Sequence, residues 1–372
     1  MNSVDLPETQ TDTIASAEIR LPSSDLKLDL PFFQNTLGFR LNKIFPADDP
    51  AVAILSGHGL CLRLERGYDA PPLTIRLLCE NPEDFAGGAT ELMAPNGCRI
   101  EVACAASPLV QPPTRHSFSV RRLRDGAPWV IGRAGMHYRD LVPDRLGGAI
   151  IASHIRIPEG GPVPDMVHYH TIGFQLIYCY RGWVRLVYED QGEPFVLEAG
   201  GCVIQPPEIR HRVLESSDKL EVVEIGVPAE HETTIDHAMS LPTPDFNPER
   251  LFGGQRFCHA KAADADWLSF RLNGFDCRET GIVDATNEVA NAVVARFNGN
   301  ATEFSQHNSD ILFTYVLEGS MTLLGENGSA NQLEAGDAFV IPPAFTHRYT
   351  DCSNDLEILE VSLPGKFETQ MN

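Results

Sequence analysis

Short runs of β-branched and aromatic residues, separated by proline and glycine, dominate the chain after residue 40. Examples are "AIIASHIRIP", "WVRLVYE", "GCVIQPP", "LEVVEIGVP" and "DAFVIPP". Many short strands with turn residues between them are typical of all-β sandwiches and barrels. The pattern therefore predicts a mainly β fold with little helix.

This pattern occurs twice in the last two-thirds of the chain. The matching segments are "HTIGFQLIYCYRG" (170–182) with "HNSDILFTYVLEG" (307–319), "LEAGGCVIQPPEIRHR" (197–212) with "LEAGDAFVIPPAFTHR" (333–348), and "KLEVVEIGVP" (219–228) with "DLEILEVSLP" (355–364). A looser match pairs the segment from Trp129 with that from Trp267. A repeat of this length predicts two copies of one all-β unit, over 115–240 and 250–372. The proline-containing "MSLPTPDFNPER" connects them.

The first part of the chain does not fit the repeat. After a leader expected to be disordered (1–15), residues 16–106 begin with the strand-like "AEIRLPSS". Four apolar residues then recur at helical spacing, namely Leu26, Leu30, Phe33 and Leu37. Three strand-like runs follow, "VAILSG", "GLCLRLER" and "LTIRLLCE". The order predicts a small α+β domain of β-α-β-β-β type.

Composition narrows the classes of function. Asp and Glu number 51 against 29 Lys and Arg, so the surface field repels phosphate backbones and anionic membranes. We therefore expect neither a nucleic-acid nor a membrane partner. No stretch approaches the roughly 20 apolar residues of a membrane span, and the acidic, polar start is unlike a signal peptide. The nine cysteines include no CxxC pair, which favours a reducing compartment and a cytoplasmic protein.

The repeat unit resembles the cupin superfamily. The residues that carry the resemblance are His168, His170, Gln175 and Gly182 for the first cupin motif, and Gly200, Pro206 and His211 for the second. An amide replaces the usual acid of the first motif at Gln175. The second motif lacks its usual glycine at Glu208 and its closing asparagine at Glu215. The resemblance covers nearly two-thirds of the chain and implies two double-stranded β-helix barrels, that is, a bicupin. It also implies a homodimer, the usual habit of cupins.

The first domain is similar to a module of the vicinal oxygen chelate (glyoxalase-like) superfamily, through "FFQNTLGFR" and a shortened second module ending in "APNGCRIEV". In that family, acids or histidines on the first and last strands hold a metal. Here Glu101 matches the last strand, but no histidine stands on the first, where only Glu18 is available. The resemblance thus implies a structural or binding role for residues 16–106.

The first repeat carries a candidate metal site. Side chains two apart on a strand share a face, so His168 and His170 project together. The cupin arrangement brings His211 to the same point. Three neutral imidazoles suit Fe(II), Ni(II), Cu(II) or Zn(II) and leave positions open. Gln175 is either a fourth ligand or a hydrogen-bonding pocket residue.

The second repeat serves as an internal control. The positions of the four candidate ligands are occupied there by Ser305, His307, Leu312 and His347. Two of the four ligand types are missing, so we expect a degenerate site. The second barrel would then stabilise, dimerise or shape access to the first.

The leading hypothesis is a metal-dependent enzyme, an Fe(II) oxygenase acting on a small chelating substrate. An uncharged ligand set leaves the ion its full charge, which favours an enolate, a diketone or a hydroxy acid. Two alternatives remain open: a Zn-, Ni- or Mn-dependent lyase, isomerase or cyclase that needs no O₂, and a non-catalytic protein that binds a small molecule. Other polar residues beside turns, namely His137, Tyr138, Arg139, His231 and His237, are expected to be solvated.

Overall fold

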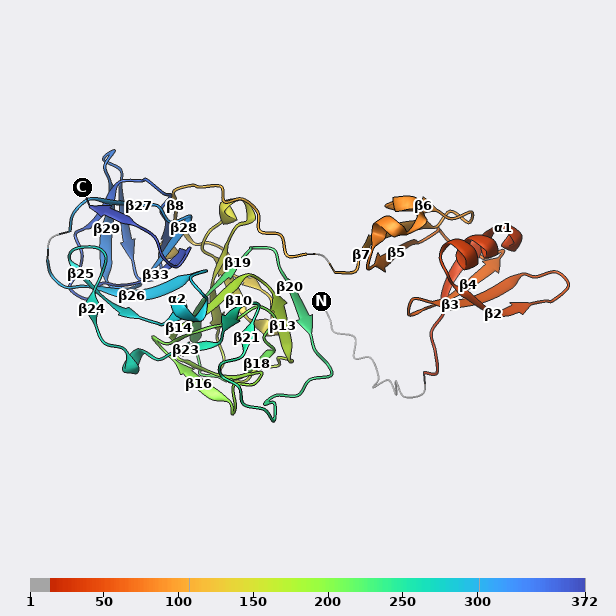
Figure 1. Ribbon diagram of the computed structural model, residues 1–372, viewed down its shortest axis with the longest axis horizontal. Coiled ribbons are helices and arrows are strands. Elements are labelled where there is room, and N and C mark those ends of the chain that lie inside the picture. Colours follow the sequence, from red (N-terminus) through yellow and green to blue (C-terminus); the bar gives the residue numbers. More distant parts are fainter. Residues whose placement is uncertain (1–13, 107, 301, 372) are drawn as a thin grey trace. The chain divides into compact units, whose positions relative to one another are not determined.

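A computed structural model describes residues 14–106, 108–300 and 302–371 (Figure 1). The chain divides into two compact units at residue 108, and each is described by itself. The expected leader, 1–15, falls outside the described residues except for residues 14 and 15.

The first unit contains a four-stranded sheet and a three-stranded sheet. The elements of the former are β1 (Ile19–Ser23), α1 (Leu26–Pro31), the π-helix η2 (Phe32–Thr36), β2 (Arg40–Phe45), β3 (Val52–Gly57) and β4 (Leu60–Arg66). Its strand order is β1-β4-β3-β2, with β1 parallel to β4. The helical apolar spacing is confirmed, because Leu26, Phe33 and Leu37 are buried against this sheet.

The smaller sheet repeats that arrangement with one strand fewer. Its elements are β5 (Thr74–Cys79), the 3-10 helices η3 (Pro82–Asp84) and η4 (Ala86–Gly88), β6 (Glu91–Met93) and β7 (Arg99–Cys104). The order is β5-β7-β6, again with the first strand parallel to the last. The β-α-β-β-β order is therefore present, but one assignment was wrong: residues 74–79 open this second sheet, and β2 completes the first.

The first barrel packs a seven-stranded sheet against a six-stranded one. The strands of the former, in spatial order, are β23 (Cys258–Ala260), β17 (Cys202–Ile204), β14 (Phe174–Arg181), β19 (Leu220–Val227), β11 (Ile151–Ile157), β10 (His137–Asp140) and β9 (Val130–Ile131). The other sheet contains β16 (Phe195–Glu198), β15 (Trp183–Tyr188), β18 (His211–Ser216), β13 (His168–Thr171) and β20 (Glu232–Ile235), with β12 (Gly161–Pro162) paired to β18. Short 3-10 turns η5 (Leu123–Asp125), η6 (Arg133–Gly135) and η7 (Arg145–Gly148) precede β11.

The second barrel follows the same plan. Its larger sheet is β24 (Leu268–Ser269), β25 (Phe275–Glu279), β26 (Asn291–Phe297), β33 (Glu357–Leu363), β28 (Ile311–Glu318), β31 (Ala338–Val340) and β8 (Ser119–Arg121). Its smaller sheet is β30 (Ala330–Glu334), β29 (Ser320–Gly325), β32 (His347–Thr350), β27 (Ser305–His307) and β34 (Thr369–Met371). The hairpin β21 (Leu251–Phe252) and β22 (Gln255–Arg256), the 3-10 turn η8 (Ala262–Asp264) and helix α2 (Ile282–Ala285) complete the unit. The predicted mainly β fold of two barrels is confirmed.

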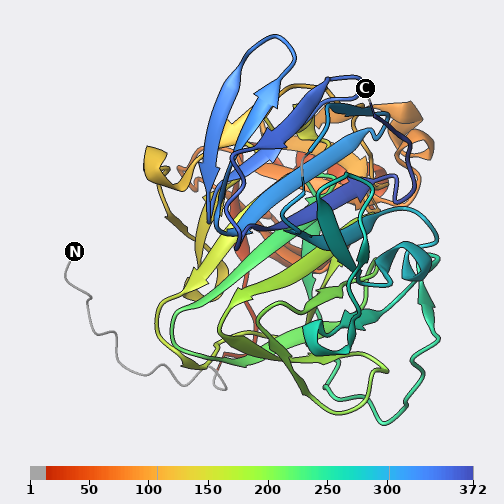
Figure 2. The same ribbon diagram turned by 90° about the vertical axis from the view of Figure 1, so that its left-hand side faces the viewer.

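Side-chain alternation divides the core into three parts. On β14, Phe174 and Leu176 face a core that both barrels share, whereas Ile177 and Cys179 face the interior of the first barrel. The second barrel has its own interior cluster. Figure 2 shows the blue strands of the second barrel lying against the green strands of the first. Each barrel therefore has an interior that is separate from the interface between them.

The two barrels also exchange a strand. Strand β8 comes before the first barrel in the chain but pairs with β31 of the second. Strand β23 comes after the first barrel yet pairs with β17 within it. Each seven-stranded sheet thus ends in a strand that belongs, along the chain, to the other repeat.

Two findings bear on the cellular setting. The cysteines are all free. None of the helices in the described ranges combines the length and the apolar character that a membrane crossing requires.

Candidate metal centre

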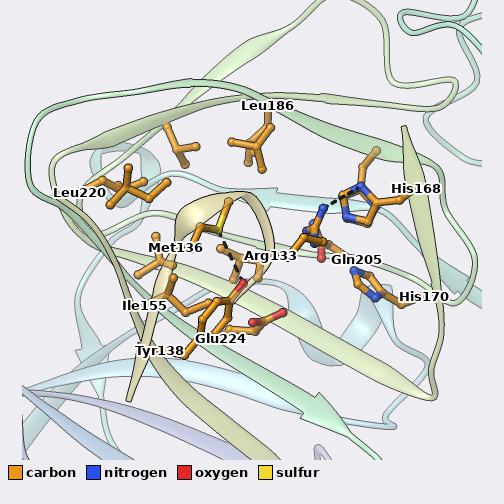
Figure 3. Close-up of a pocket in the computed structure, with 16 residues that line it drawn as sticks. Arg133, Met136, Tyr138, Ile155, His168, His170, Leu186, Gln205, Leu220 and Glu224 are labelled. Atoms are coloured by element: carbon orange, nitrogen blue, oxygen red, sulfur yellow. Dashed lines mark hydrogen bonds between the residues drawn. The ribbon is translucent and has the colours of Figure 1, made fainter. Parts of the chain in front are cut away.

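Strands β13 and β18 bring three histidines together inside the first barrel. His168 and His170 are buried on β13 while Tyr169 between them is partly exposed, as strand alternation predicts. His168 lies directly opposite His211, the first residue of β18. One ring nitrogen from each imidazole lies within 4.8 Å of the others. Figure 3 shows His168 and His170 on the same side of the cavity.

Hydrogen bonds hold each ring by its Nδ1 atom. His168 Nδ1 lies 2.8 Å from the Met166 carbonyl oxygen, and His211 Nδ1 lies 2.9 Å from the Ile209 carbonyl oxygen. A carbonyl only accepts, so these two Nδ1 atoms carry the proton and the Nε2 lone pairs stay free. His170 Nδ1 lies 2.9 Å from the Thr233 hydroxyl. Anchoring of one ring nitrogen is the usual support for a ligand that binds metal through the other.

The second ring nitrogen of His168, Nε2, has no partner among the protein atoms that the structure describes. His168 Nε2 is buried and has no hydrogen-bond partner. A buried polar atom without a partner costs about 1–3 kcal/mol unless something binds it. A divalent ion bound by the three imidazoles would satisfy this atom, so the residues present fit a metal.

Burial keeps the three rings uncharged. It lowers the pKa of His170 to about 3, with further lowering from His168 and His231. The pKa of His211 is well below its ordinary value because of burial and the two neighbouring imidazoles. Burial, and then the Arg133 guanidinium, lower the pKa of His168. Neutral imidazole is the form that binds metal ions.

Gln175 occupies the interior face of β14, which it shares with Ile177. Its Nε2 donates to Glu224 Oε1 at 2.6 Å, and its Oε1 is buried without a partner. The amide oxygen is therefore available inside the barrel, and the amide plane is oriented by Glu224.

The site includes polar residues that the sequence analysis missed. Arg133 forms an ion pair with the buried Asp165, whose other oxygen accepts from the Val213 amide at 2.9 Å. Glu224 lines the cavity, and burial raises its pKa despite the hydrogen bond from Gln175. The repeat held a signal for both residues: Glu224 aligns with Glu360 inside apolar strands, and Arg133 aligns with Arg271.

Some residues expected to be solvated are not. Arg139 is fully buried and donates to the Gly336 carbonyl oxygen at 2.6 Å. Tyr138 lines the cavity, and the ring of His231 lies 5.6 Å from that of His170, centroid to centroid. The expectation was wrong for Arg139 and Tyr138, because the pairing of β10 with β11 carries them inward, while His137 and His231 are partly exposed. His237 is exposed, as expected.

The second barrel repeats the register without the cluster. Ser305 lies opposite His347 as His168 lies opposite His211. The rings of His307 and His347 are 6.4 Å apart, and Leu312 is buried at the position of Gln175. Across the residues that the structure covers, the one group of three or more potential metal ligands is in the first barrel.

Comparisons with known proteins bear on the fold. No family model matches the chain, and no curated protein matches it in sequence. Among solved structures, salicylate 1,2-dioxygenase from Pseudaminobacter salicylatoxidans is 14% identical with a TM-score of 0.52, over 71% of this chain and 90% of that one. Oxalate decarboxylase from Lactobacillus farciminis is 15% identical with a TM-score of 0.52, over 70% and 91%. Oxalate decarboxylase from Bacillus subtilis is 13% identical with a TM-score of 0.52, over 70% of this chain and 80% of that one.

This chain has the bicupin fold. At these identities the likeness concerns the fold alone, and the chemistry of this bicupin has to be argued from its own site.

Proposed function

We propose that this bicupin is a metal-dependent enzyme that oxygenates a small chelating organic substrate at the first barrel, using one Fe(II). The observation that carries the proposal is the convergence of His168, His170 and His211, all neutral and anchored through Nδ1. Three imidazoles leave coordination positions open for a substrate and O₂. When bound, Fe(II) would supply O₂ activation, with the three histidines as ligands.

The chain's own residues support this role in two ways. Gln175 would be a fourth ligand of the ion before substrate binds, because its buried amide oxygen lacks a partner and Glu224 holds its amide group. A chelating substrate would displace it, so that a position stays open for O₂. Because the imidazoles and the amide are uncharged, the ion would keep its double positive charge, which favours binding of an anionic chelating group. Arg133 and Glu224 then stand at the cavity wall, where they orient the substrate.

Elemental analysis of the protein purified without added metal tests the proposal. We expect about one equivalent of metal, lost in His211→Ala and kept in His347→Ala, which changes the matching residue of the second barrel. Gln175→Leu, which installs the second barrel's residue, should weaken metal binding about 10- to 100-fold. Metal binding unchanged by His211→Ala would contradict the site.

The choice of chemistry has its own test. Protein loaded anaerobically with Fe(II) should give a ferrous–nitrosyl EPR signal with nitric oxide, a stand-in for O₂, and His211→Ala should not. If only Zn(II) is retained and turnover needs no oxygen, the oxygenase assignment is wrong and Lewis-acid chemistry replaces it.

We also infer that residues 16–106 form a glyoxalase-like domain without a metal of its own. The support is the strand order in both sheets, each with its first strand parallel to its last. The acids named for that family's metal positions contact arginines instead: Glu18 contacts Arg63 at 3.6 Å, and Glu101 contacts Arg99 at 3.4 Å.

The free cysteines support a cytoplasmic protein. The homodimer stays a prediction that light scattering would test.

A further inference from the structure

We propose that the substrate of the first barrel is a compact chelator with an uncharged, apolar body, and that this body lies in the aliphatic end of the barrel. The inference rests on the proposed function and names the substrate class of the same site. Three observations carry it: the cavity lining, its charge balance and the contrast with the second barrel.

The cavity has a polar end and an apolar end. His168, His170 and Gln205 lie on one side in Figure 3, and Leu220 and Ile155 lie on the other. The aliphatic part of the wall comprises Met136, Ile155, Ile157, Ile177, Val184, Leu186, Val213, Leu220 and Val222. Contact between apolar surface of this kind and a ligand's hydrocarbon is favourable, whereas burial of a charged group against it is unfavourable.

The charge balance leaves no place for a second anionic group. Arg133 is the one cation among the described residues that line the cavity, and it is already paired with Asp165, which is 2% exposed. A carboxylate at the far end of a ligand would therefore lose its hydration without gaining a counter-charge. A ligand with a single chelating head avoids this cost.

The second barrel shows the same fold with larger side chains at three interior positions. By strand register and repeat alignment, Met136, Ile157 and Val213 of the first barrel are replaced by Phe275, Phe297 and Tyr349. Phe275 contacts both other rings, at centroid distances of 5.7 Å and 5.8 Å, within the interior cluster. The first barrel therefore has room at these three positions because its side chains there are smaller, while the fold is the same.

The volume limits the ligand. The cavity measures about 80 Å³. Since one water molecule needs roughly 10–15 Å³ on this measure, the space holds about five to eight water-sized groups. A chelating head with a short apolar body would fill it.

A series of straight-chain hydroxamates bound to the Zn(II)-loaded protein tests the inference by calorimetry. These monoanionic chelators share one head and differ in apolar length. From acetohydroxamate to hexanohydroxamate, affinity should rise about three- to fourfold per methylene, from about 0.8 kcal/mol for each buried CH₂. The monohydroxamate of adipic acid, which has the same length as hexanohydroxamate but ends in a carboxylate, should bind at least about tenfold more weakly than hexanohydroxamate.

Two variants locate the effect. Val213→Tyr, which installs the residue of the second barrel, should reduce the hexano-to-aceto affinity ratio to below about twofold. The matched Tyr349→Val in the second barrel should leave the whole series unchanged. Ile157→Phe serves the same purpose if Val213→Tyr does not fold.

The outcomes separate this inference from the proposed function. Metal-dependent acetohydroxamate binding with no gain in affinity along the series would overturn the apolar-body inference and leave the metal site standing. Absence of metal-dependent binding by every member would overturn the proposed function itself. A length gain that survives both Val213→Tyr and Ile157→Phe would place the body outside the barrel and contradict the inference.

Discussion

A histidine at the same place in the two barrels has the same protonation state but different surroundings. His170 and its counterpart His307 both face an interior, and burial lowers their pKa values to about 3 and about 4. His170 is anchored by Thr233, whereas both ring nitrogens of His307 are buried without a hydrogen bond. Burial is the largest cause of the low pKa in both rings, and the hydrogen bond at Nδ1 is present for His170 and absent for His307.

The pKa of His307 predicts a loss of stability in mild acid. The unfolded imidazole binds a proton near its ordinary pKa of about 6.5, and the folded one only near 4. The unfolded state therefore holds more protons between these values, so the free energy of unfolding falls as the pH drops from about 6.5 to about 4. Urea unfolding across this range should show a shallower fall in His307→Asn than in the wild type. Substitution of the exposed His237 by Asn is the control, and an equal change in both variants would contradict the prediction.

At the scale of single residues, sequence motifs predict which histidines come together better than they predict what surrounds them. The histidine pair and the distant His211 were found because their spacing is fixed by strand alternation and by one turn. Asp165 and Gln205 were not found, because their contacts to Arg133 and Tyr188 join segments that only the folded barrel brings together. Glu224 was overlooked although an acid inside an apolar strand already indicates an unusual environment.

Equivalent strands of the two barrels, β19 and β33, carry a glutamate that has a different partner in each barrel. In the second barrel, strand β33 presents Glu360 to Arg271, with Nε to Oε1 at 3.0 Å and side chains only 3% and 18% exposed. In the first, the equivalent acid and arginine bind other partners, Gln175 and Asp165. The acid and the arginine pair with each other in the second barrel, whereas in the first barrel they are separated and each has another partner.

This buried ion pair predicts a large effect on stability. Glu360→Ala leaves the Arg271 charge buried without a partner, and we expect a loss of about 3–5 kcal/mol in the free energy of unfolding. The double variant Arg271→Met with Glu360→Leu should recover most of it, since apolar replacement of both partners removes the desolvation cost. The exposed pair of Lys366 and Glu288 is the comparison: Lys366→Ala should change the free energy of unfolding little, because solvent screens this pair. A loss for Glu360→Ala as small as that for Lys366→Ala in urea unfolding would contradict this account.

The sequence did not predict strands in which apolar and polar residues fail to alternate. Strand β2 was not recognised because all but one of its residues are exposed, so no apolar period of two marks it. Strands β3, β4 and β5 were recognised because each contains buried apolar residues. The sheet to which β5 belongs could not be predicted, since pairing is decided by tertiary packing.

The two barrels are more closely joined than the sequence repeat suggests, because each contains a strand from the other repeat. The duplication in the sequence predicts two like barrels, and the structure has them. The strand exchange leaves no comparable signal, because β8 and β23 have three residues each and no buried side chain to set a pattern. A boundary between the repeats along the chain is therefore not a boundary between the barrels in space.

This arrangement predicts where the chain tolerates a cut. Residues 109–372 expressed alone should fold, because residue 108 marks the division between the compact units. The pieces 109–248 and 249–372, expressed separately, should not, since each loses an edge strand and its half of the shared core. Circular dichroism and size-exclusion chromatography check both statements. A monomeric, cooperatively unfolding 109–248 would show that the exchange contributes little.

The strand exchange also determines the order in which the protein can be completed during synthesis. Strand β8 leaves the ribosome long before β31, the strand with which it pairs, and β17 stays an open edge until residues 258–260 follow. An open strand edge is a template for pairing with another chain. The nascent first barrel therefore has its three clustered histidines before its larger sheet is complete, and strand β23 covers the open edge of β17 only when residues 258–260 have been translated.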